Sequence, residues 1–339
     1  MHAVVLSRAQ EPNTMHAVVL SRAQEPNTMH AVVLDADSLG QGIDLTPIEQ
    51  QVGRLDIHGQ TAPEQVVERL TGAEVVLVNK VPISGDNLAA LPSLRLICVM
   101  ATGTNNIDMQ AAERLGIKVR NVNAYGTESV AQHTLLLLLS LAARMPLYQR
   151  DIQAGKWQQS RFFCLFDHPT LELSGKHLVI VGQGELGSRV ATLAEAFGMR
   201  VTFAARPGAA NDSRPDLASL APEADAISLH CPLTDATQHL VDAALLERLK
   251  PSALLVNCAR GGIIDEVAAL EVLRDGRLGG LGVDVLPVEP PRDGHPLLDV
   301  MGEALNLIVT PHNAWISPEA RQRIVALSAE NLQDFIAKT

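Results

Sequence analysis

The chain has 339 residues, of which 47% are hydrophobic and 19% are charged, and its formal net charge is −11. This length allows one large or two medium domains, and the composition is typical of a soluble globular protein. The acidic balance argues against nucleic acid and against an anionic membrane surface as partners. An anionic ligand would therefore need local arginines or helix ends.

Cysteine usage and hydropathy indicate a cytoplasmic protein. The four cysteines have neither metal-ligand nor disulfide spacing and are interpreted as reduced packing residues: Cys98, Cys164, Cys231 and Cys258. Cys258 lies two positions before Arg260 and could have a further role, although packing is favoured. We expect no membrane span, because the leucine-rich run 134–143 is too short, and we expect no signal peptide.

The N-terminus contains a repeat. The sequence MHAVVLSRAQEPNT occupies residues 1–14 and again 15–28, and a third MHAVVL begins at Met29. We interpret residues 1–28 as a duplicated start that stays disordered and takes no part in the fold. A functional arm is the alternative.

Residues 29–123 alternate short apolar runs with amphipathic ones, which predicts a parallel α/β domain. The expected strands are 30–34, 75–78, 96–99 and 118–121, and the expected helical segments are 63–70, 88–91 and 109–115. The loop 100–108 (MATGTNNID) follows a strand and precedes a helix. Its Thr102 and Gly103 could present backbone N–H groups to a carboxylate, although a plain turn would use the same residues.

The next segment is a long apolar helix followed by aromatic residues. Residues 129–144 are apolar on most helical faces, which predicts a helix that packs between domains or between subunits. Much of the scarce aromatic content follows, and we interpret it as an interface or a pocket wall: Trp157, Phe162, Phe163 and Phe166.

Residues 176–206 predict a strand, a glycine turn, a helix and a second strand, over 177–181, 182–187, 185–197 and 200–204. Gly182, Gly184 and Gly187 form G-x-G-x-x-G between the first strand and the helix. In this context the glycines allow a sharp turn, close approach of a pyrophosphate and close packing of helix on strand. We therefore predict dinucleotide binding, with a plain αβ turn as the alternative.

The remaining chain continues the α/β alternation. Strands are expected at 226–229, 253–257, 280–284 and 307–310, with helices at 242–249 and 266–274 between them. This pattern predicts a doubly wound parallel sheet, whose ligands bind beyond the carboxyl ends of the strands. An amphipathic helix over 317–336 is expected to return to the first domain.

Three candidate chemical groups follow three of these strands: Arg260, Glu289 and His312. Together they suit the reduction of a 2-keto acid. Histidine can donate a proton near neutral pH, a carboxylate beside it favours the imidazolium, and arginine binds a carboxylate in a bidentate manner. Each residue alone also has an ordinary interpretation: a surface ion-pair partner, an acid in a turn and a hydrogen-bonded core histidine.

The order of G-x-G-x-x-G, N-x-A-R-G-G, D-x-x-x-x-E-P and T-P-H resembles the D-isomer-specific 2-hydroxyacid dehydrogenase family. The stretches ATGTNNID, GKWQQSRFFCLFD and LHCPLT are similar to its bacterial glycerate dehydrogenase, or hydroxypyruvate reductase, branch. The resemblance implies a flavodoxin-like substrate domain (29–124 plus 312–339), into which a Rossmann-type cofactor domain (125–311) is inserted. It also implies a homodimer, with the long helix in the interface.

The same resemblance assigns the site. Arg260 binds substrate, His312 is the acid and base, Glu289 supports it, and Thr102 with Gly103 holds the substrate carboxylate. Asp284 holds the nicotinamide carboxamide. The other expected cofactor contacts are Gly182, Gly184, Glu185, Leu186, Gly187, Arg206, Cys258 and Ala259. No metal is expected.

One departure concerns the cofactor. An acidic residue about 20 positions beyond the glycines normally binds the ribose 2′-OH of NAD, but this chain has Ala204-Ala205-Arg206-Pro207 there. Arginine in place of the acid favours NADP(H), or use of both cofactors. Alternatively, Arg206 stacks on the adenine or faces solvent while NADH binds.

The resemblance therefore implies a reductase of hydroxypyruvate or glyoxylate that yields D-glycerate or glycolate. A D-lactate or other D-2-hydroxyacid dehydrogenase is the alternative among enzymes. From another class, the alternative is a cofactor-sensing binding protein like the C-terminal-binding corepressors. The complete set of Arg260, Glu289 and His312 favours an enzyme.

Overall fold

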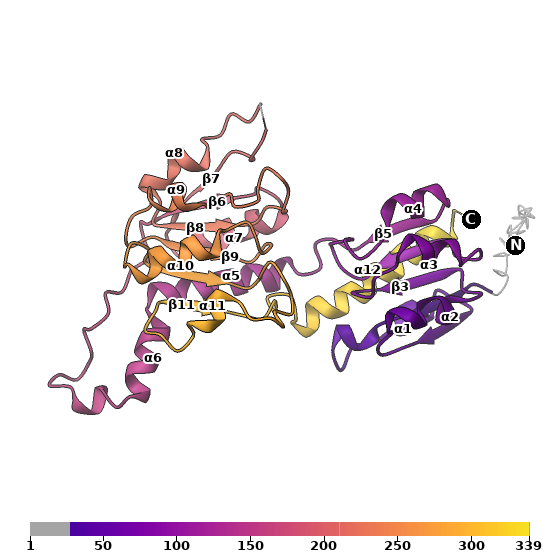
Figure 1. Ribbon diagram of the computed structural model, residues 1–339, viewed down its shortest axis with the longest axis horizontal. Coiled ribbons are helices and arrows are strands. Elements are labelled where there is room, and N and C mark those ends of the chain that lie inside the picture. The colour runs from indigo at the N-terminus through magenta and orange to yellow at the C-terminus, as the bar shows by residue number, and fades with distance from the viewer. Residues whose placement is uncertain (1–27, 210, 339) are drawn as a thin grey trace, which may run out of the picture.

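The structure, a computed structural model, describes residues 28–209 and 211–338 (Figure 1). The chain forms two α/β lobes joined by a narrow waist, and each lobe is built on one parallel sheet. The prediction of two doubly wound parallel sheets is confirmed. The duplicated start predicted for residues 1–28 lies outside the described residues except for Thr28.

The first sheet has five parallel strands in the flavodoxin-like order β2-β1-β3-β4-β5. The strands are β1 His30–Val33, β2 Arg54–Ile57, β3 Val75–Val78, β4 Leu96–Val99 and β5 Lys118–Asn121. Every residue of β3 and β4 is buried, as expected for apolar central strands of a parallel sheet. The helices are α1 Thr46–Glu49, α2 Val66–Leu70, α3 Gly85–Ala89 and α4 Met109–Arg114.

The C-terminal helix α12 (Pro318–Ile336) packs on this first sheet (Figure 1). It contacts β4 and α1 and buries Ile324, Val325 and Leu332 in one apolar cluster with residues of β1, β3 and β4. The chain therefore crosses into the second lobe after β5 and returns after the last strand of that lobe.

The second sheet has six parallel strands in the order β11-β10-β9-β8-β6-β7. They are β6 His177–Val181, β7 Arg200–Phe203, β8 Ala226–Leu229, β9 Leu254–Asn257, β10 Gly280–Val283 and β11 Leu307–Val309. The helices among them are α7 Glu185–Ala196, α8 Leu217–Leu220, α9 Ala243–Leu246, α10 Glu266–Arg274 and α11 Pro296–Asp299. The strand order reverses direction between β6 and β8, which is where ligands of doubly wound sheets bind.

The long helix α5 (Thr127–Ala142) covers the second sheet (Figure 1). Gly280 and Gly282 of β10 let it approach closely, because a Cβ at either position would lie 3.1–3.3 Å from Leu137 or Leu141. The expectation that this helix packs between domains is therefore wrong for most of its length. Only its first turn reaches the space between the lobes, and packing between subunits stays a prediction.

The segment after α6 (Met145–Gln153) projects from the second lobe (Figure 1). Its aromatic side chains are exposed, by 52% at Trp157, 65% at Phe162, 90% at Phe163 and 77% at Phe166. They line neither the cleft between the lobes nor the two smaller pockets at 146–153 with 300–307 and at 42–43 with 318–326, and the interpretation as an interface or a pocket wall stays a prediction. No single described helix is long and apolar enough to cross a membrane; only α5 and α6 together, bent by 60°, pass by length and composition.

Candidate active site

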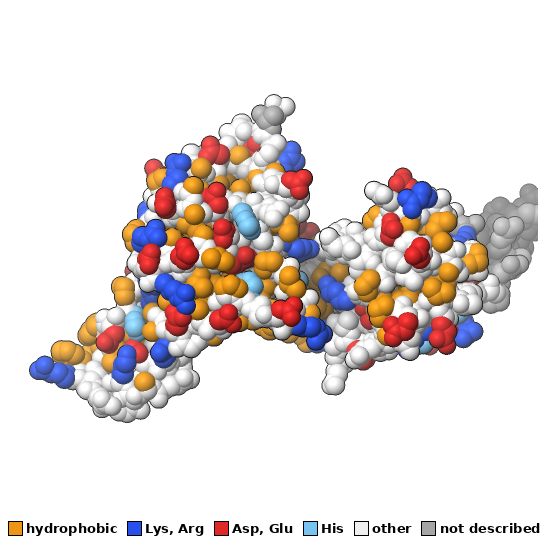
Figure 2. Space-filling view, in the orientation of Figure 1, with side chains coloured by type: hydrophobic (Ala, Val, Ile, Leu, Met, Phe, Trp, Pro, Cys, Tyr) orange, Lys and Arg blue, Asp and Glu red, His pale blue; other side chains and the backbone are white. Residues whose placement is uncertain are grey.

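A cleft of about 800 Å³ lies between the two lobes, at the waist that Figure 2 shows. We call it the interlobe cleft. The first lobe contributes the loops that follow β3 and β4, and the second lobe contributes the loops that follow β6, β8, β9, β10 and β11. Both parallel sheets thus direct the carboxyl ends of their strands toward one space, which is the expected position for a ligand.

The glycine motif forms the turn between β6 and α7. Gly182 has a φ of +106°, and a Cβ there would lie 2.4 Å from the carbonyl oxygen of His230. A Cβ on Gly187 would lie 1.9 Å from the carbonyl oxygen of Gly182, whereas a Cβ on Gly184 would meet nothing within 4 Å. Only the second glycine therefore faces open space, directly at the N-terminus of α7. This arrangement fits a pyrophosphate held by backbone N–H groups and the helix dipole.

A pair of charged residues, Asp212 and Arg214, lies beyond this turn, in the loop that follows β7. The guanidinium of Arg214 donates to both carboxylate oxygens of Asp212, over 2.9 and 2.5 Å, and to Oε1 of Gln183 in the glycine turn, over 2.9 Å. The backbone N–H of Arg206 donates to the same Asp212 carboxylate. These hydrogen bonds, that of the Arg214 side chain first, hold the pKa of Asp212 well below its usual range. Arg206 itself is exposed and outside the interlobe cleft.

The loop after β9 is shaped by Asn257, which is fully buried. Its side chain donates to the carbonyl oxygen of Arg260 over 2.8 Å and accepts from the N–H of Ala259 over 3.0 Å. Arg260 is thereby turned toward the first lobe. A Cβ on Gly103 would lie 3.6 Å from Nη2 of Arg260, so the guanidinium reaches the loop that follows β4.

That loop has free donors. The Thr102 hydroxyl donates to the carbonyl oxygen of Val122, and Asn121 Nδ2 donates to the carbonyl oxygen of Thr102 over 2.6 Å. These bonds anchor the loop to the end of β5. The backbone N–H groups of Thr102 and Gly103 have no hydrogen-bond partner among the described residues. Two unsatisfied donors thus lie beside a guanidinium, an arrangement suited to a carboxylate.

His312 and Glu289 form a close pair at the same cleft. His312 Nδ1 lies 2.5 Å from Glu289 Oε2, and Glu289 Oε1 accepts the N–H of Leu286 over 2.8 Å. Burial raises the pKa of Glu289, but the hydrogen bonds from His312 and Leu286 and the charges of His312 and Lys80 outweigh it and lower that pKa. Glu289 therefore stays ionised and fixes the Nδ1 side of the ring, which leaves Nε2 for a substrate.

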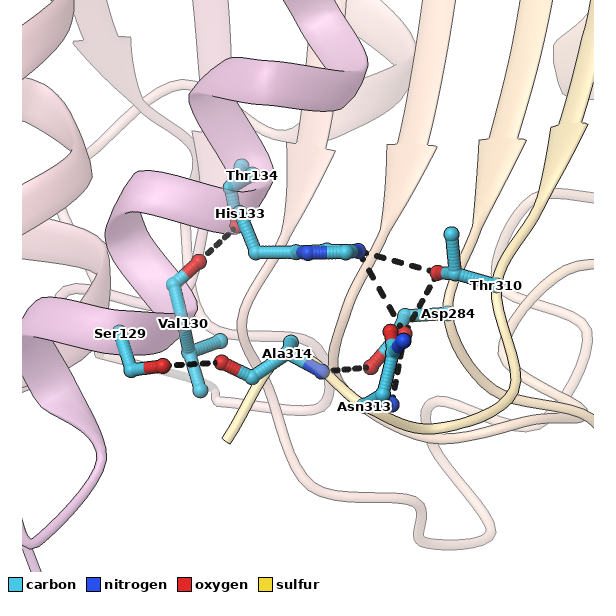
Figure 3. A network of polar contacts seen from close by, with 8 residues as sticks. All are labelled: Ser129, Val130, His133, Thr134, Asp284, Thr310, Asn313 and Ala314. Carbon is cyan, nitrogen blue, oxygen red and sulfur yellow. Dashed lines mark hydrogen bonds and ion pairs between the residues drawn. The ribbon is translucent and has the colours of Figure 1, made fainter. Parts of the chain in front are cut away.

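Asp284 holds the turn from Thr310 to Ala314, which includes His312; Figure 3 shows its contacts with Thr310, Asn313 and Ala314. Its buried carboxylate accepts the Thr310 hydroxyl over 2.5 Å and the N–H groups of Asn313 and Ala314 over 3.0 and 3.1 Å. Its carbonyl oxygen accepts the N–H of His312 over 2.8 Å. His133 of α5 completes the network, with Nε2 at 3.0 Å from Thr310 Oγ1. These contacts stabilise the left-handed backbone of His312, whose φ is +51°.

Cys258 and Ala259 are buried beside this network. Burial raises the pKa of the Cys258 thiol to about 12, despite a hydrogen bond from Thr134 that lowers it. A neutral, buried thiol is no nucleophile. The interpretation of Cys258 as a packing residue therefore agrees with its environment. All four cysteines are unpaired, and no group of metal ligands occurs among the described residues.

The structure thus brings most of the predicted site residues to one cleft. The first lobe supplies Thr102 and Gly103, and the second supplies Glu185, Leu186, Cys258, Ala259, Arg260, Asp284, Glu289 and His312. Gly182, Gly184 and Gly187 form the adjoining turn, and Arg206 lies further out. Sequence reasoning missed six residues at or beside the site: Lys80, Tyr125, Gln183, Asp212, Arg214 and His230. For Lys80 a signal was available, because it follows a predicted strand by two positions.

Comparison with known proteins points in the same direction. Residues 135–314 match the family model of the D-isomer specific 2-hydroxyacid dehydrogenase, NAD binding domain. The chain is 43% identical over 276 residues to the glycerate dehydrogenase of Methylorubrum extorquens, which covers 81% of this chain and 86% of that protein. It is 33% identical over 281 residues to the hydroxypyruvate reductase of Blautia hydrogenotrophica, which covers the same shares.

Among solved structures, that of D-2-hydroxyisocaproate dehydrogenase matches with a TM-score of 0.79 and 26% identity, over 91% of this chain and 97% of that one. The match extends over both lobes, so the likeness includes the sheet of the first lobe as well as the NAD-binding lobe. The family model, the related sequences and the two-lobed fold agree: the chain belongs to the D-isomer specific 2-hydroxyacid dehydrogenase family.

Proposed function

We propose that this protein reduces hydroxypyruvate to D-glycerate and also accepts glyoxylate, with a nicotinamide cofactor. The observation that carries the proposal is the His312–Glu289 pair, which faces the same cleft as Arg260 and the free N–H groups of Thr102 and Gly103. The relatives named glycerate dehydrogenase and hydroxypyruvate reductase support this choice of substrate.

In this proposal the chain fixes the substrate between its two lobes. The N–H groups of Thr102 and Gly103 bind the carboxylate, and the guanidinium of Arg260 binds the carboxylate and the C2 carbonyl oxygen. When bound, the nicotinamide supplies the hydride that adds to C2. The charge that develops on the C2 oxygen then lies beside Arg260, which is already in place and needs no reorganisation.

His312 supplies the proton. Nε2 of the imidazolium donates to the C2 oxygen, while Glu289 accepts a hydrogen bond from Nδ1 and stabilises the charged ring. Glu289 acts through His312 and is a positioning residue. Asp284 is also a positioning residue, because it holds the turn that carries His312. Its Oδ2 atom accepts a single N–H, that of Ala314, so it could also accept a hydrogen bond from a nicotinamide carboxamide.

The experiment is the initial rate of NADH or NADPH oxidation with hydroxypyruvate, on protein that begins at Met29. His312→Ala is expected to lose most of kcat, by at least about 100-fold, because a general acid contributes that much or more. Arg260→Ala is expected to raise KM more than it lowers kcat. Near-normal turnover by the His312 variant would refute the assignment.

For the cofactor we propose NADP(H) over NAD(H), or the use of both. Arg206 stands where an acidic residue would repel a 2′-phosphate, and Arg214 is held nearby against Gln183 of the glycine turn. The exposed guanidinium of Arg206 suits a 2′-phosphate, and Arg214, whose charge is shared with Asp212, adds Nη1 on the side of the glycine turn. The ratio of kcat/KM for the two cofactors measures this preference.

Two alternatives make different predictions. A D-lactate or other D-2-hydroxyacid dehydrogenase would prefer pyruvate or a larger keto acid to hydroxypyruvate. A cofactor-sensing binding protein would bind NAD(H) without turnover of any keto acid. The complete pair of His312 and Glu289 favours an enzyme.

We also propose a cytoplasmic homodimer. The exposed Phe163 and Leu136, the latter on the outer face of α5, would be covered by a second copy. Analytical ultracentrifugation of the native protein and of Phe163→Asp tests this: the variant is expected to shift toward the monomer.

A further inference from the structure

Lys80 lies in the interlobe cleft, although no motif points to it. It follows β3 by two positions, and β3 adjoins β1 where the strand order of the first sheet reverses. A sheet of this order binds its ligands beyond the carboxyl ends of the strands at that reversal. Lys80 therefore occupies the ligand position of the first lobe, as the loops after β6 and β8 do in the second.

The backbone at Lys80 is held firmly. The carboxylate of Asp35, which follows β1 and is 5% exposed, accepts three backbone N–H groups: those of Asn79 over 2.8 Å, Lys80 over 2.6 Å and Val81 over 3.3 Å. Because the Asp35 carboxylate accepts these three N–H groups, it fixes the backbone from which the Lys80 side chain extends. Asp35 and the Lys80 ammonium form no ion pair. The side chain is free to reach into the cleft.

Lys80, on the first lobe, and Arg260, on the second, line the same cleft. Neither forms an ion pair within the described ranges, 28–209 and 211–338. Burial and the charge of Arg260, in that order, lower the pKa of Lys80, while Glu289 and Asp35 raise it by less. Glu289 is already shared by His312 and the N–H of Leu286. Two cations that repel each other in one cleft are stabilised by an anion placed between them.

We propose that Lys80 is a second substrate-binding cation, whose ammonium binds the carboxylate of the 2-keto acid on the side opposite Arg260. This inference rests on the proposed function. The charges balance: Lys80 and Arg260 carry two positive charges, the substrate carboxylate carries one negative charge, and the C2 oxygen develops a second as it is reduced. Glu289 and the charged His312 balance each other.

The test compares Lys80→Met, which removes the charge with little change in size, with Lys80→Arg, which keeps it. Lys118→Met is the matched control, because Lys118 is an exposed lysine on β5 of the same lobe, outside the cleft. Steady-state rates with hydroxypyruvate are measured for each, with circular dichroism and melting curves to check the fold. Lys80→Ala replaces the methionine variant if that one does not fold.

We expect Lys80→Met to raise KM by about 10- to 100-fold, the loss of one hydrogen bond to a charged group, with a much smaller effect on kcat. Lys80→Arg should recover most of the affinity, and Lys118→Met should match the wild type. The wild-type KM should also rise at alkaline pH as Lys80 loses its proton. The part of that rise that comes from Lys80 should be absent from both Lys80 variants, because methionine carries no charge and arginine stays protonated; His312, Tyr125 and Glu289, which line the same cleft, are present in all three proteins.

A KM for Lys80→Met within twofold of the wild type would overturn the inference and leave the proposed function intact. Titration calorimetry with oxalate, an unreactive analogue, on the cofactor-loaded protein separates the two failures. If the wild type reduces no keto acid, the proposed function fails. In that case, oxalate binding that is lost in Lys80→Met and kept in Lys80→Arg still supports an anion site at Lys80. Equal binding by all variants refutes it.

Discussion

Glu289→Gln tests the central pair of the site. The substitution keeps the size of the side chain and an oxygen for the N–H of Leu286, but it removes the charge 2.5 Å from Nδ1 of His312. Two unit charges about 4 Å apart interact by about 1 kcal/mol in water and about 4 kcal/mol at a protein surface. Because both side chains are about one-third exposed, at 37% for His312 and 32% for Glu289, we take about 1–2 kcal/mol.

That loss destabilises the charged ring, so fewer molecules hold the proton needed for reduction. We expect kcat/KM for hydroxypyruvate to fall about tenfold at neutral pH, and the alkaline limb of its pH profile to move toward acid by about one unit. Toward acidic pH the rates of the two proteins should converge. The measurement is the pH profile of the wild type and the variant under identical ionic strength.

Glu289→Asp is the control, because it keeps the charge but shortens the side chain. It should retain the position of the alkaline limb better than Glu289→Gln. An unmoved profile in the glutamine variant would show that Glu289 does not stabilise the charged form of His312, and the reasoning from this contact would be wrong.

Three further predictions concern the second lobe. Gly187→Ala should lower the free energy of unfolding by about 3 kcal/mol, because its Cβ meets the backbone oxygen of Gly182. Gly184→Ala should unfold like the wild type but bind cofactor more weakly, because its Cβ meets no protein atom within 4 Å and enters the space expected for the pyrophosphate. Urea unfolding measures the first effect and cofactor titration the second. Arg214→Met should weaken binding of 2′,5′-ADP about tenfold and binding of 5′-AMP much less, and equal losses in calorimetry would contradict the proposed 2′-phosphate site. Burial lowers the pKa of His230 from 6.5 to about 4, so the unfolded chain takes up a proton before the folded chain does. The free energy of unfolding should therefore fall by on the order of 3 kcal/mol as the pH drops from 6.5 to about 4. Urea unfolding at these two pH values should show this loss in the wild type and not in His230→Asn.

Local sequence was enough wherever an element is both apolar and central. β3, β4 and β6 have the predicted bounds, because continuous apolar runs between turns leave little choice of structure. The same signals failed at β2 (Arg54–Ile57), an edge strand paired only with β1 and never fully buried. Its sequence, Arg-Leu-Asp-Ile, has no continuous apolar run that would predict a strand, and its Arg54 and Asp56 form an ion pair with each other.

The chain by itself determined the glycine turn and the groups that follow strands β9, β10 and β11, because a turn and a strand end are set by neighbouring residues. Only the tertiary structure decided which residues of the two lobes line the cleft together, and hence which charged side chains come close to one another. Lys80 and Arg260 are 180 positions apart in the sequence, and Arg214 reaches Gln183 from a loop beyond β7. Electrostatic and hydrogen-bond energies depend on distance in space, and no local pattern encodes such distances.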